Sequence, residues 1–279
     1  MASSSHIRSN SLPSGSHPTI SSIEQQLNKL KSLESSSTPN ALTISNGLCG
    51  LVELYKSTNR LLNLPQTLQI FSKYQNAKWV DELLECPVKF LDICGTTREF
   101  VSQLKQNVRD LQSSLRRRKG DLSIESSITK YTSSLRKKMK KDAKKHISTL
   151  KKMDQAIKSF ILEVDQDVAY VIRVLREINA TSISTFQLVL IFLTASKSKE
   201  GKWSISRITL NKGRVACEGQ QANFNELEVL DGALCKNISS LQQDLEKLEV
   251  SIEEIEKGLE GISRCLIRSR TSLLNIVPC

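Results

Sequence analysis

The residues best able to do chemistry in this sequence are basic, and they are concentrated in one stretch. Residues 105–152 contain 16 Lys and Arg but 4 Asp and Glu, a difference of +12, whereas the whole 279-residue chain carries a formal charge of +11. The remainder of the chain is therefore nearly neutral, at −1. A local excess of this size predicts one basic element that attracts an anionic partner, and it argues against a generally basic surface.

The candidate contact surface lies on a predicted helix within this stretch, where apolar residues recur at helical spacing. Its cations are Arg136, Lys137, Lys138, Lys140, Lys141, Lys144 and Lys145. A basic amphipathic helix of this kind could bind an anionic membrane surface or calmodulin. The run Arg136–Lys141, with Arg116–Lys119 as a second basic island, is also typical of a nuclear-import sequence.

Two further interpretations of the basic stretch compete with these. The composition of the stretch does not favour binding to nucleic acid, because Tyr131 is the only aromatic residue available to stack on bases. The cations could instead form a solvated face that pairs in part with residues 226–261, which hold 10 acidic and 3 basic residues.

Patterns typical of catalysis, metal binding or cofactor binding are missing from the sequence. His146 lies among Lys144, Lys145 and Lys151, whose charges should disfavour its protonated form, but no nucleophile or orienting acid is close to it. The 7 Cys are dispersed without a CxxC, and none of the 3 His lies near a Cys pair. We therefore expect a protein that is not an enzyme, that holds no metal or cofactor, and whose thiols are reduced.

The sharpest short motif surrounds Ser11, in a serine-rich segment with few apolar residues. Arg8 precedes Ser11 by three positions and Pro13 follows it by two, which matches the phosphoserine pattern bound by 14-3-3 proteins. A phosphate on Ser11 would supply the charge that such a partner binds. Residues 1–18 as a whole are predicted to be a disordered tail.

Long helices are expected to position these residues, because Gly (11) and Pro (6) are scarce and tight turns need both. Apolar spacing predicts helices from Ser21, over 41–64 and 66–86, from beyond Pro87 to Gly120, over 124–175 and over 227–266. Residues 196–216 are predicted to be mostly irregular. We therefore predict an all-α, elongated bundle of six to eight helices that forms one domain over residues 19–279.

The predicted helix over 227–266 has a coiled-coil-like seam. Its apolar positions are three and four residues apart, with one extra four-residue step from Leu234 to Ile238. The seam could pack inside this chain's own bundle or form a coiled coil with another chain. Gly258 and Gly261 are expected to weaken its C-terminal end.

An intracellular location, most simply the cytoplasm, is expected. No segment reaches about 18 uncharged apolar residues, and the longest apolar run, Ile183–Ala195, predicts a buried core helix. The first residues have no apolar signal-peptide region. A peripheral membrane or nuclear location remains open, and a chloroplast location is less expected because Arg8 is the only arginine before Glu24.

Several stretches resemble a plant family related to the BYPASS proteins. They are residues 50–67, 79–99, 111–131, 136–141, 171–184 and 268–276, together with the tail SNSLPS. The resemblance implies a role in root and shoot development, where the best-known relatives restrain a mobile root-derived signal. It implies no activity, cofactor or active site.

The expected function is therefore that of a non-catalytic helical adaptor with an unidentified protein partner. Its contact surfaces would be the basic helix from Arg136 to Lys152 and the heptad helix from Ile238 to Leu266. The alternative is a peripheral membrane or trafficking-associated protein that binds anionic lipid through the same basic helix.

Overall fold

The computed structural model describes residues 18–34, 39–117, 121–158, 166–194, 225–236 and 241–276. The helices are α1 (Pro18–Glu34), α2 (Ala41–Leu62), α3 (Pro65–Lys73), α4 (Lys78–Arg116), α5 (Asp121–Thr129), the π-helix η1 (Lys130–Leu135), α6 (Arg136–Lys158), α7 (Gln166–Thr194), α8 (Glu226–Lys236) and α9 (Leu241–Ile276). Because α5, η1 and α6 are continuous, the described chain holds eight separate helices and no strand. The predicted all-α bundle is confirmed.

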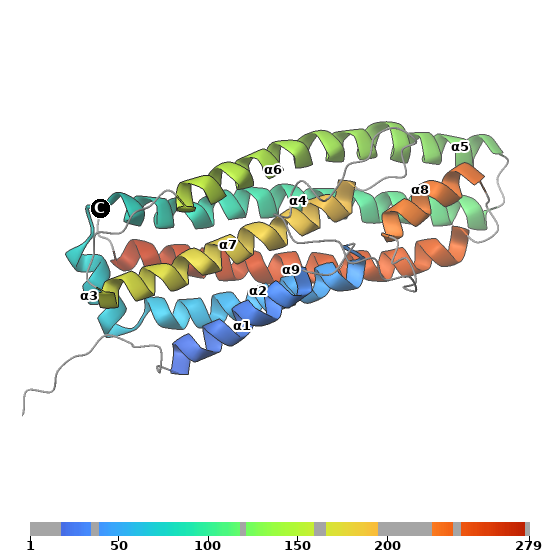
Figure 1. The fold of residues 1–279 in the computed structure, drawn as a ribbon. Coiled ribbons are helices and arrows are strands. Elements are labelled where there is room, and N and C mark those ends of the chain that lie inside the picture. Colours follow the sequence, from blue (N-terminus) through green and yellow to red (C-terminus); the bar gives the residue numbers. More distant parts are fainter. Residues whose placement is uncertain are drawn as a thin grey trace, which may run out of the picture.

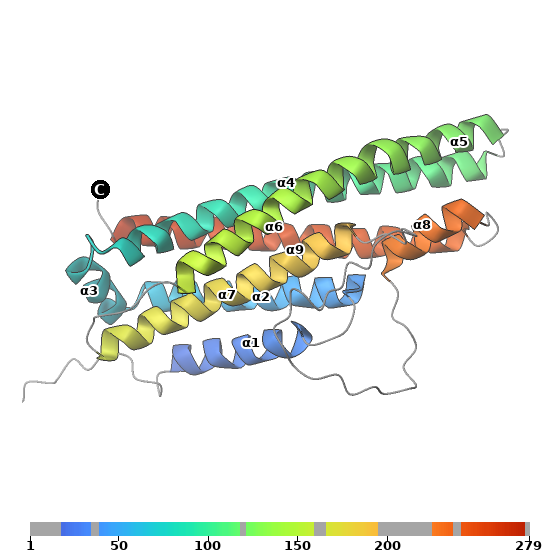
Figure 2. The same ribbon diagram turned by 45° about the horizontal axis from the view of Figure 1, so that its top comes forward.

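The bundle is elongated, and its long helices run side by side (Figures 1 and 2). Helix α4 alone has 39 residues, which corresponds to a length of about 58 Å. Helix α9 packs along both α2 and α4, and α7 packs against α1, α2 and α6. Two helices, α9 and α7, therefore lie at the centre of the core, while α6 runs along one long edge of the bundle.

The coiled-coil-like seam is used inside the chain. Its described positions on α9 are all buried: Leu241, Leu245, Leu248, Ile252, Ile255, Leu259, Ile262 and Leu266. The seam therefore packs on α2 and α4 and offers no free apolar stripe to a second chain. The alternative of a coiled coil with another chain through this seam is wrong, whereas a contact through the exposed side of the helix, which carries Val250 and Ile267, stays a prediction.

The prediction of one helix over 227–266 is also wrong. Helix α8 ends at Lys236, α9 begins at Leu241, and the two helices pack against each other. The extra four-residue step between Leu234 and Ile238 falls at this break, and Ile238 lies outside the described residues. A step that interrupts a heptad pattern can thus mark the end of one helix and the start of the next.

The chain also breaks at a different place from the one expected near Pro87. Pro87 lies inside α4, while the predicted helix over 66–86 is interrupted by a turn at residues 74–77. A proline inside a helix costs about 3 kcal/mol or more. Val80 and Phe90, on either side of Pro87, are fully buried, and their packing holds the helix together across the proline.

The predicted helix over 124–175 is instead two antiparallel helices, α6 and α7. The Arg136 guanidinium near the start of α6 donates from Nη1 to the carbonyl oxygen of Leu193 near the end of α7, at 2.5 Å. At the opposite end, Arg176 Nη2 donates to the carbonyl oxygen of Ile157, also at 2.5 Å. Apolar periodicity continued through residues 157–175 because both helices bury a stripe in the same core.

Helix α7 has an apolar sequence that its position in the bundle explains. By length and composition alone, residues Ala169–Thr194 could cross a membrane, and they are the only such candidate among the described residues. Within the bundle, however, 61% of the 18-residue apolar stretch in this segment is buried. Helix α7 has α1, α2 and α6 as neighbours. The residues expected to form a buried core helix, among them Ile183, Phe186 and Leu190, are indeed buried.

Gly258 has a packing role that the sequence did not suggest. A Cβ atom at Gly258 would lie 2.8 Å from the Cβ atom of Leu48 on α2. At Gly261 the nearest atom would be Val52 Cγ2, at 3.0 Å. These glycines let α9 approach α2 closely, so they support this end of the seam and do not weaken it.

Candidate docking face on helix α6

Helix α6 divides into a buried side and an exposed side. The buried side carries Met139, Ala143, Ile147, Leu150, Met153 and Ile157, which all belong to the main core. These positions are three and four residues apart, as the 3.6-residue period requires for one face of a helix. The apolar half of this amphipathic helix is therefore covered by the rest of the chain.

The exposed side is a strip of lysines. We call the exposed residues Lys137, Lys141, Lys144, Lys145, Lys151 and Lys152 the lysine face. Helix α6 as a whole carries ten basic and two acidic residues, a net charge of +8. From Lys137 to Lys152 the strip is about 22 Å long, and its side chains fall within one side of the helix.

One lysine of α6 and one of η1 form ion pairs with acidic residues of α4. Lys138 Nζ lies 3.2 Å from Glu99 Oε1, and Lys130 Nζ on η1 lies 3.6 Å from Asp110 Oδ2. All four side chains are well exposed, so each pair contributes little to stability. Lys138 therefore lies between the lysine face and Glu99 on α4, and it is not counted in the lysine face.

Arg136 does not belong to the lysine face, so its prediction as a surface contact is wrong. Its side chain is 5% exposed, and Nη2 lies 2.8 Å from Asp231 Oδ2 on α8. Arg136 is seven residues before Ala143 and fourteen before Leu150, so it occupies the buried side of the helix. The helical period therefore indicated that Arg136 lies on the buried side. It did not indicate the partner of Arg136, because Asp231 is 95 residues away in the sequence.

The π-helix η1 completes this buried cluster. Tyr131 Oη donates to Asp231 Oδ1 at 3.0 Å, and the Arg136 guanidinium lies 6.0 Å from the centre of the Tyr131 ring. Burial is the main cause that raises the pKa of Tyr131. Since Arg136 also binds the carbonyl oxygen of Leu193, the cluster joins η1, α6, α7 and α8 at one point.

Two other basic residues of the segment lie between the two sides. Lys140 is half-buried, and burial followed by the nearby charge of Arg136 lowers its pKa. His146 is also half-buried, and burial followed by the charge of Lys145 lowers its pKa. The expectation that neighbouring lysines disfavour protonated His146 is confirmed, although burial is the larger cause.

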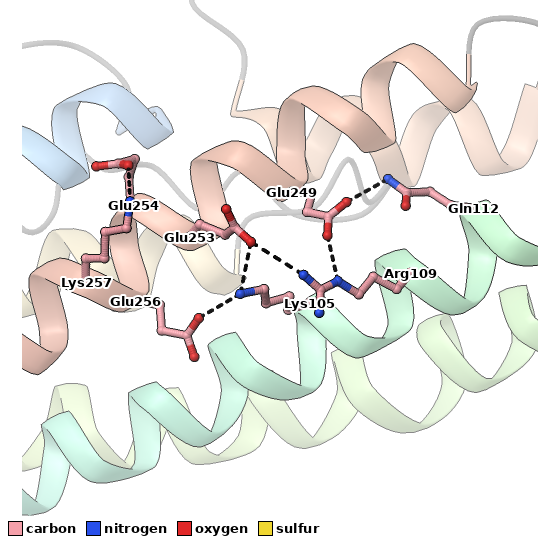
Figure 3. A network of polar contacts seen from close by, with 8 residues as sticks. All are labelled: Lys105, Arg109, Gln112, Glu249, Glu253, Glu254, Glu256 and Lys257. Carbon is pink, nitrogen blue, oxygen red and sulfur yellow. Dashed lines mark hydrogen bonds and ion pairs between the residues drawn. The ribbon is translucent and has the colours of Figure 1, made fainter.

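Lys105 and Arg109 of α4 have acidic partners on α9, which Figure 3 shows. Lys105 Nζ lies 3.1 Å from both Glu253 Oε1 and Glu256 Oε2. Arg109 Nε lies 2.6 Å from Glu249 Oε1, and its Nη2 lies 3.4 Å from Glu253 Oε1. The predicted pairing between the basic and acidic segments therefore occurs on α4 as well as in the Arg136–Asp231 pair of α6 and α8, and we call the network on α4 the α4–α9 charge seam.

Hydrogen bonding within the seam shifts the pKa of its members. The Arg109 side chain, which is the largest cause, and Gln112 hold the pKa of Glu249 below its ordinary value. Gln112 Nε2 donates to Glu249 Oε2 at 3.1 Å, as Figure 3 shows. The seam thus pairs cations of α4 with carboxylates of α9, two helices whose apolar sides are already packed together.

The described interior offers little room for a ligand. A cavity of about 20 Å³ between α4, α6 and α7 is lined by Trp79, Cys86 and Ile172, among others. This volume suits about one water molecule. In the part of the chain that the structure describes, no group of three or more His, Cys, Asp or Glu could hold a metal ion.

The described thiols are those of Cys49, Cys86, Cys94 and Cys265, and none of these four forms a disulfide. Cys49 is exposed, whereas the other three are buried. Burial raises the pKa of Cys86 to about 12, and it raises that of Cys94 as well. These two groups are therefore protonated near neutral pH.

Ser11 and residues 1–17 of the predicted disordered tail lie outside the described residues, as do residues 196–216. Pro18, the last residue of the predicted tail, begins α1 instead. A family model described as Protein BPS1 matches residues 47–276, more than four-fifths of the chain. Among curated proteins there is no significant match. Among solved structures there is none either.

Proposed function

The chain belongs to the Protein BPS1 family of BYPASS-related plant proteins, and on that premise we propose that it is a non-catalytic helical adaptor in root and shoot development. In this proposal the lysine face of α6 is the surface through which the adaptor docks on an acidic partner. The observation that carries the proposal is the exposure of six lysines on one side of a helix whose other side is fixed in the core.

A fixed basic surface has physical advantages for docking. Like charges gathered on one strip create a field that attracts an anionic partner and increases the rate of encounter. The buried positions Met139, Leu150 and Met153 hold the helix in place, so little ordering is needed when the partner arrives. Binding of this kind weakens as salt concentration rises.

The burial of the apolar stripe argues against two of the modes considered from the sequence. Calmodulin and the interior of a membrane interface both bind the apolar face of a basic amphipathic helix. Ala143 and Leu150, on that face, are each 1% exposed or less. Docking through the charged side leaves the bundle intact and is therefore favoured.

Proximity labelling in living root cells tests the proposed function. The docking variant changes Lys137, Lys141, Lys145 and Lys152 to Gln. A control variant changes four exposed lysines elsewhere, Lys29, Lys56, Lys78 and Lys247, to Gln, and so removes the same charge from α1, α2, α4 and α9. The control matters because net charge alone affects non-specific association.

The wild type and the control variant are expected to label the same neighbours, and the docking variant is expected to lose them. Equal accumulation of all three proteins, checked on the same samples, would show that the loss is not caused by degradation. If the docking variant labels the same neighbours as the wild type, the lysine face is not the docking surface and the proposal is wrong.

A further inference from the structure

We propose that the lysine face binds the phosphate groups of an anionic lipid bilayer, with Ser148 at the centre of the contact. This inference rests on the proposed function, because it names the partner of the same face. The bilayer would be held at its surface, without insertion of the helix.

Ser148 is surrounded by lysines on the surface of α6. It is exposed, with Lys144 and Lys145 four and three residues before it and Lys151 and Lys152 three and four residues after it. Helical residues three or four apart are neighbours, with Cβ atoms about 5–6 Å apart. A short hydroxyl side chain therefore lies between four long ammonium groups, which can reach one phosphate together while the hydroxyl donates a hydrogen bond.

The chemical composition of the face favours lipid phosphates over an acidic protein surface. Protein interfaces are enriched in Tyr, Trp and Arg and depleted in Lys. The one arginine of α6, Arg136, is buried, as is Tyr131 on η1. A lysine ammonium is a compact, mobile charge that does not require the fixed planar partner preferred by arginine, which suits laterally mobile headgroups.

The shape of the molecule permits this contact. Helix α6 lies along one long edge of the bundle, so its outer side can approach an extended surface along its length (Figure 1). The acidic residues of α6 itself, Asp142 and Asp154, are only half-buried on its flanks, and Asp154 Oδ2 is 2.6 Å from Lys158 Nζ. On the α4 side, Glu99 pairs with Lys138.

Because the apolar stripe of α6 is buried, attraction to the bilayer is purely electrostatic. Each lysine near an anionic membrane surface contributes roughly a fivefold increase in affinity. The loss of the four lysines around Ser148 should therefore weaken binding by about two orders of magnitude, allowing for screening by salt. Membrane insertion would instead survive high salt.

Vesicle flotation with the full-length protein tests this inference. The vesicles contain phosphatidylcholine alone, or phosphatidylcholine with about a third phosphatidylserine. The variants are Lys144, Lys145, Lys151 and Lys152→Gln, the control Lys29, Lys56, Lys78 and Lys247→Gln, and Ser148→Asp. Circular dichroism of each variant checks that it is folded.

The wild type and control should float with the phosphatidylserine vesicles alone, and should be released when salt is raised from about 100 mM to about 500 mM. The four-lysine variant should bind about a hundredfold more weakly, and Ser148→Asp roughly fivefold more weakly, because it places one negative charge between the lysines. Flotation of the four-lysine variant at wild-type levels would overturn the inference, as would salt-resistant binding.

The result also separates this inference from the proposed function. If the wild type does not bind anionic vesicles while the docking variant still fails to label the wild-type neighbours in root cells, the adaptor proposal stands and the partner is an acidic protein. If vesicles are bound but the neighbours in cells do not depend on the lysine face, lipid binding stands without the adaptor role. Failure of both experiments removes both proposals.

Discussion

Helices α4 and α6 are both rich in cations, yet their charges have different surroundings. On α4, Lys105 and Arg109 lie within 3.4 Å of carboxylates on α9 and form the charge seam. On α6, the residues of the lysine face are exposed. The helix itself runs along the edge of the bundle (Figure 1). A charge excess in the sequence therefore divides into charge that joins two helices and charge that is exposed along one side of a helix.

The largest expected effect concerns Arg136, which lies on α6 but is used as an internal residue. Arg136→Ala leaves the carboxylate of Asp231, which is 18% exposed, without its cation, so we expect a loss of about 3 kcal/mol in the free energy of unfolding, near the lower end for a buried pair. Lys137→Ala, one residue further on the exposed side, should change it by at most about 0.5 kcal/mol. Urea unfolding followed by circular dichroism measures both.

Equal destabilisation by these two neighbouring substitutions would contradict the division of α6 into a buried and an exposed side. The double variant Arg136→Met with Asp231→Leu provides a further check, because replacing both charges by apolar groups should recover much of the lost stability.

The next effect tests the close packing that places α9 against α2. Gly258→Ala should lower the free energy of unfolding by about 1–3 kcal/mol, because its Cβ atom would lie 2.8 Å from Leu48 Cβ. Gly95→Ala on α4 meets nothing within 4 Å and should raise it by up to about 1 kcal/mol through helix propensity. Thermal unfolding of the two variants should therefore shift in opposite directions, and shifts of the same sign would argue against the α2–α9 contact.

A smaller effect, dependent on pH, is expected at Glu249 in the charge seam. Its pKa is lowered in the folded protein, so its ionised form contributes stability above its unfolded pKa and loses it as pH falls through the folded value. Glu249→Gln should cost about 0.5–1 kcal/mol at pH 7, since Glu249 is 23% exposed but Arg109 is 51% exposed.

The difference between wild type and Glu249→Gln should shrink as the pH falls below about 4. Urea unfolding at pH 7, 5, 4 and 3 follows this difference. A difference that grows on acidification would show that the seam carboxylate is not stabilised in its charged form.

The smallest effects are expected from replacing one lysine on α4 and one on α6. Lys105→Gln removes contacts with Glu253 and Glu256 and should destabilise by up to about 1 kcal/mol. Lys141→Gln removes the repulsion between Lys141 and the lysines four residues away, Lys137 and Lys145. It should therefore stabilise the folded protein by a few tenths of a kcal/mol. The two shifts in the urea midpoint should have opposite signs at low salt and converge at high salt.

Periodicity predicted the interior of this protein well. The seam positions on α9 and the buried side of α6 both follow from apolar residues at helical spacing. The same rule could have placed Arg136 inside, because it is in step with Ala143 and Leu150. Its charge favours the surface, because arginine is almost never fully buried unless it is paired, and the pairing with Asp231 is not visible in the sequence.

The ends of the helices were predicted less well, because long-range packing decides them. Pro87 lies within a helix because Val80 and Phe90 are held in the core. The break between α6 and α7 was hidden because both helices carry a core-facing stripe. The roles of Asp231 and Gly258 depend on partners distant in the sequence, and a single sequence does not contain those distances.

The docking face itself is tested most directly by amine footprinting of the full-length protein, alone and in root extract that retains its membranes. The lysines of the lysine face should lose reactivity towards an acylating reagent in the extract, while Lys29, Lys56 and Lys78 keep theirs. Unchanged reactivity of the lysine face, or equal protection of all these lysines, would contradict the proposal that α6 presents its charge to a partner.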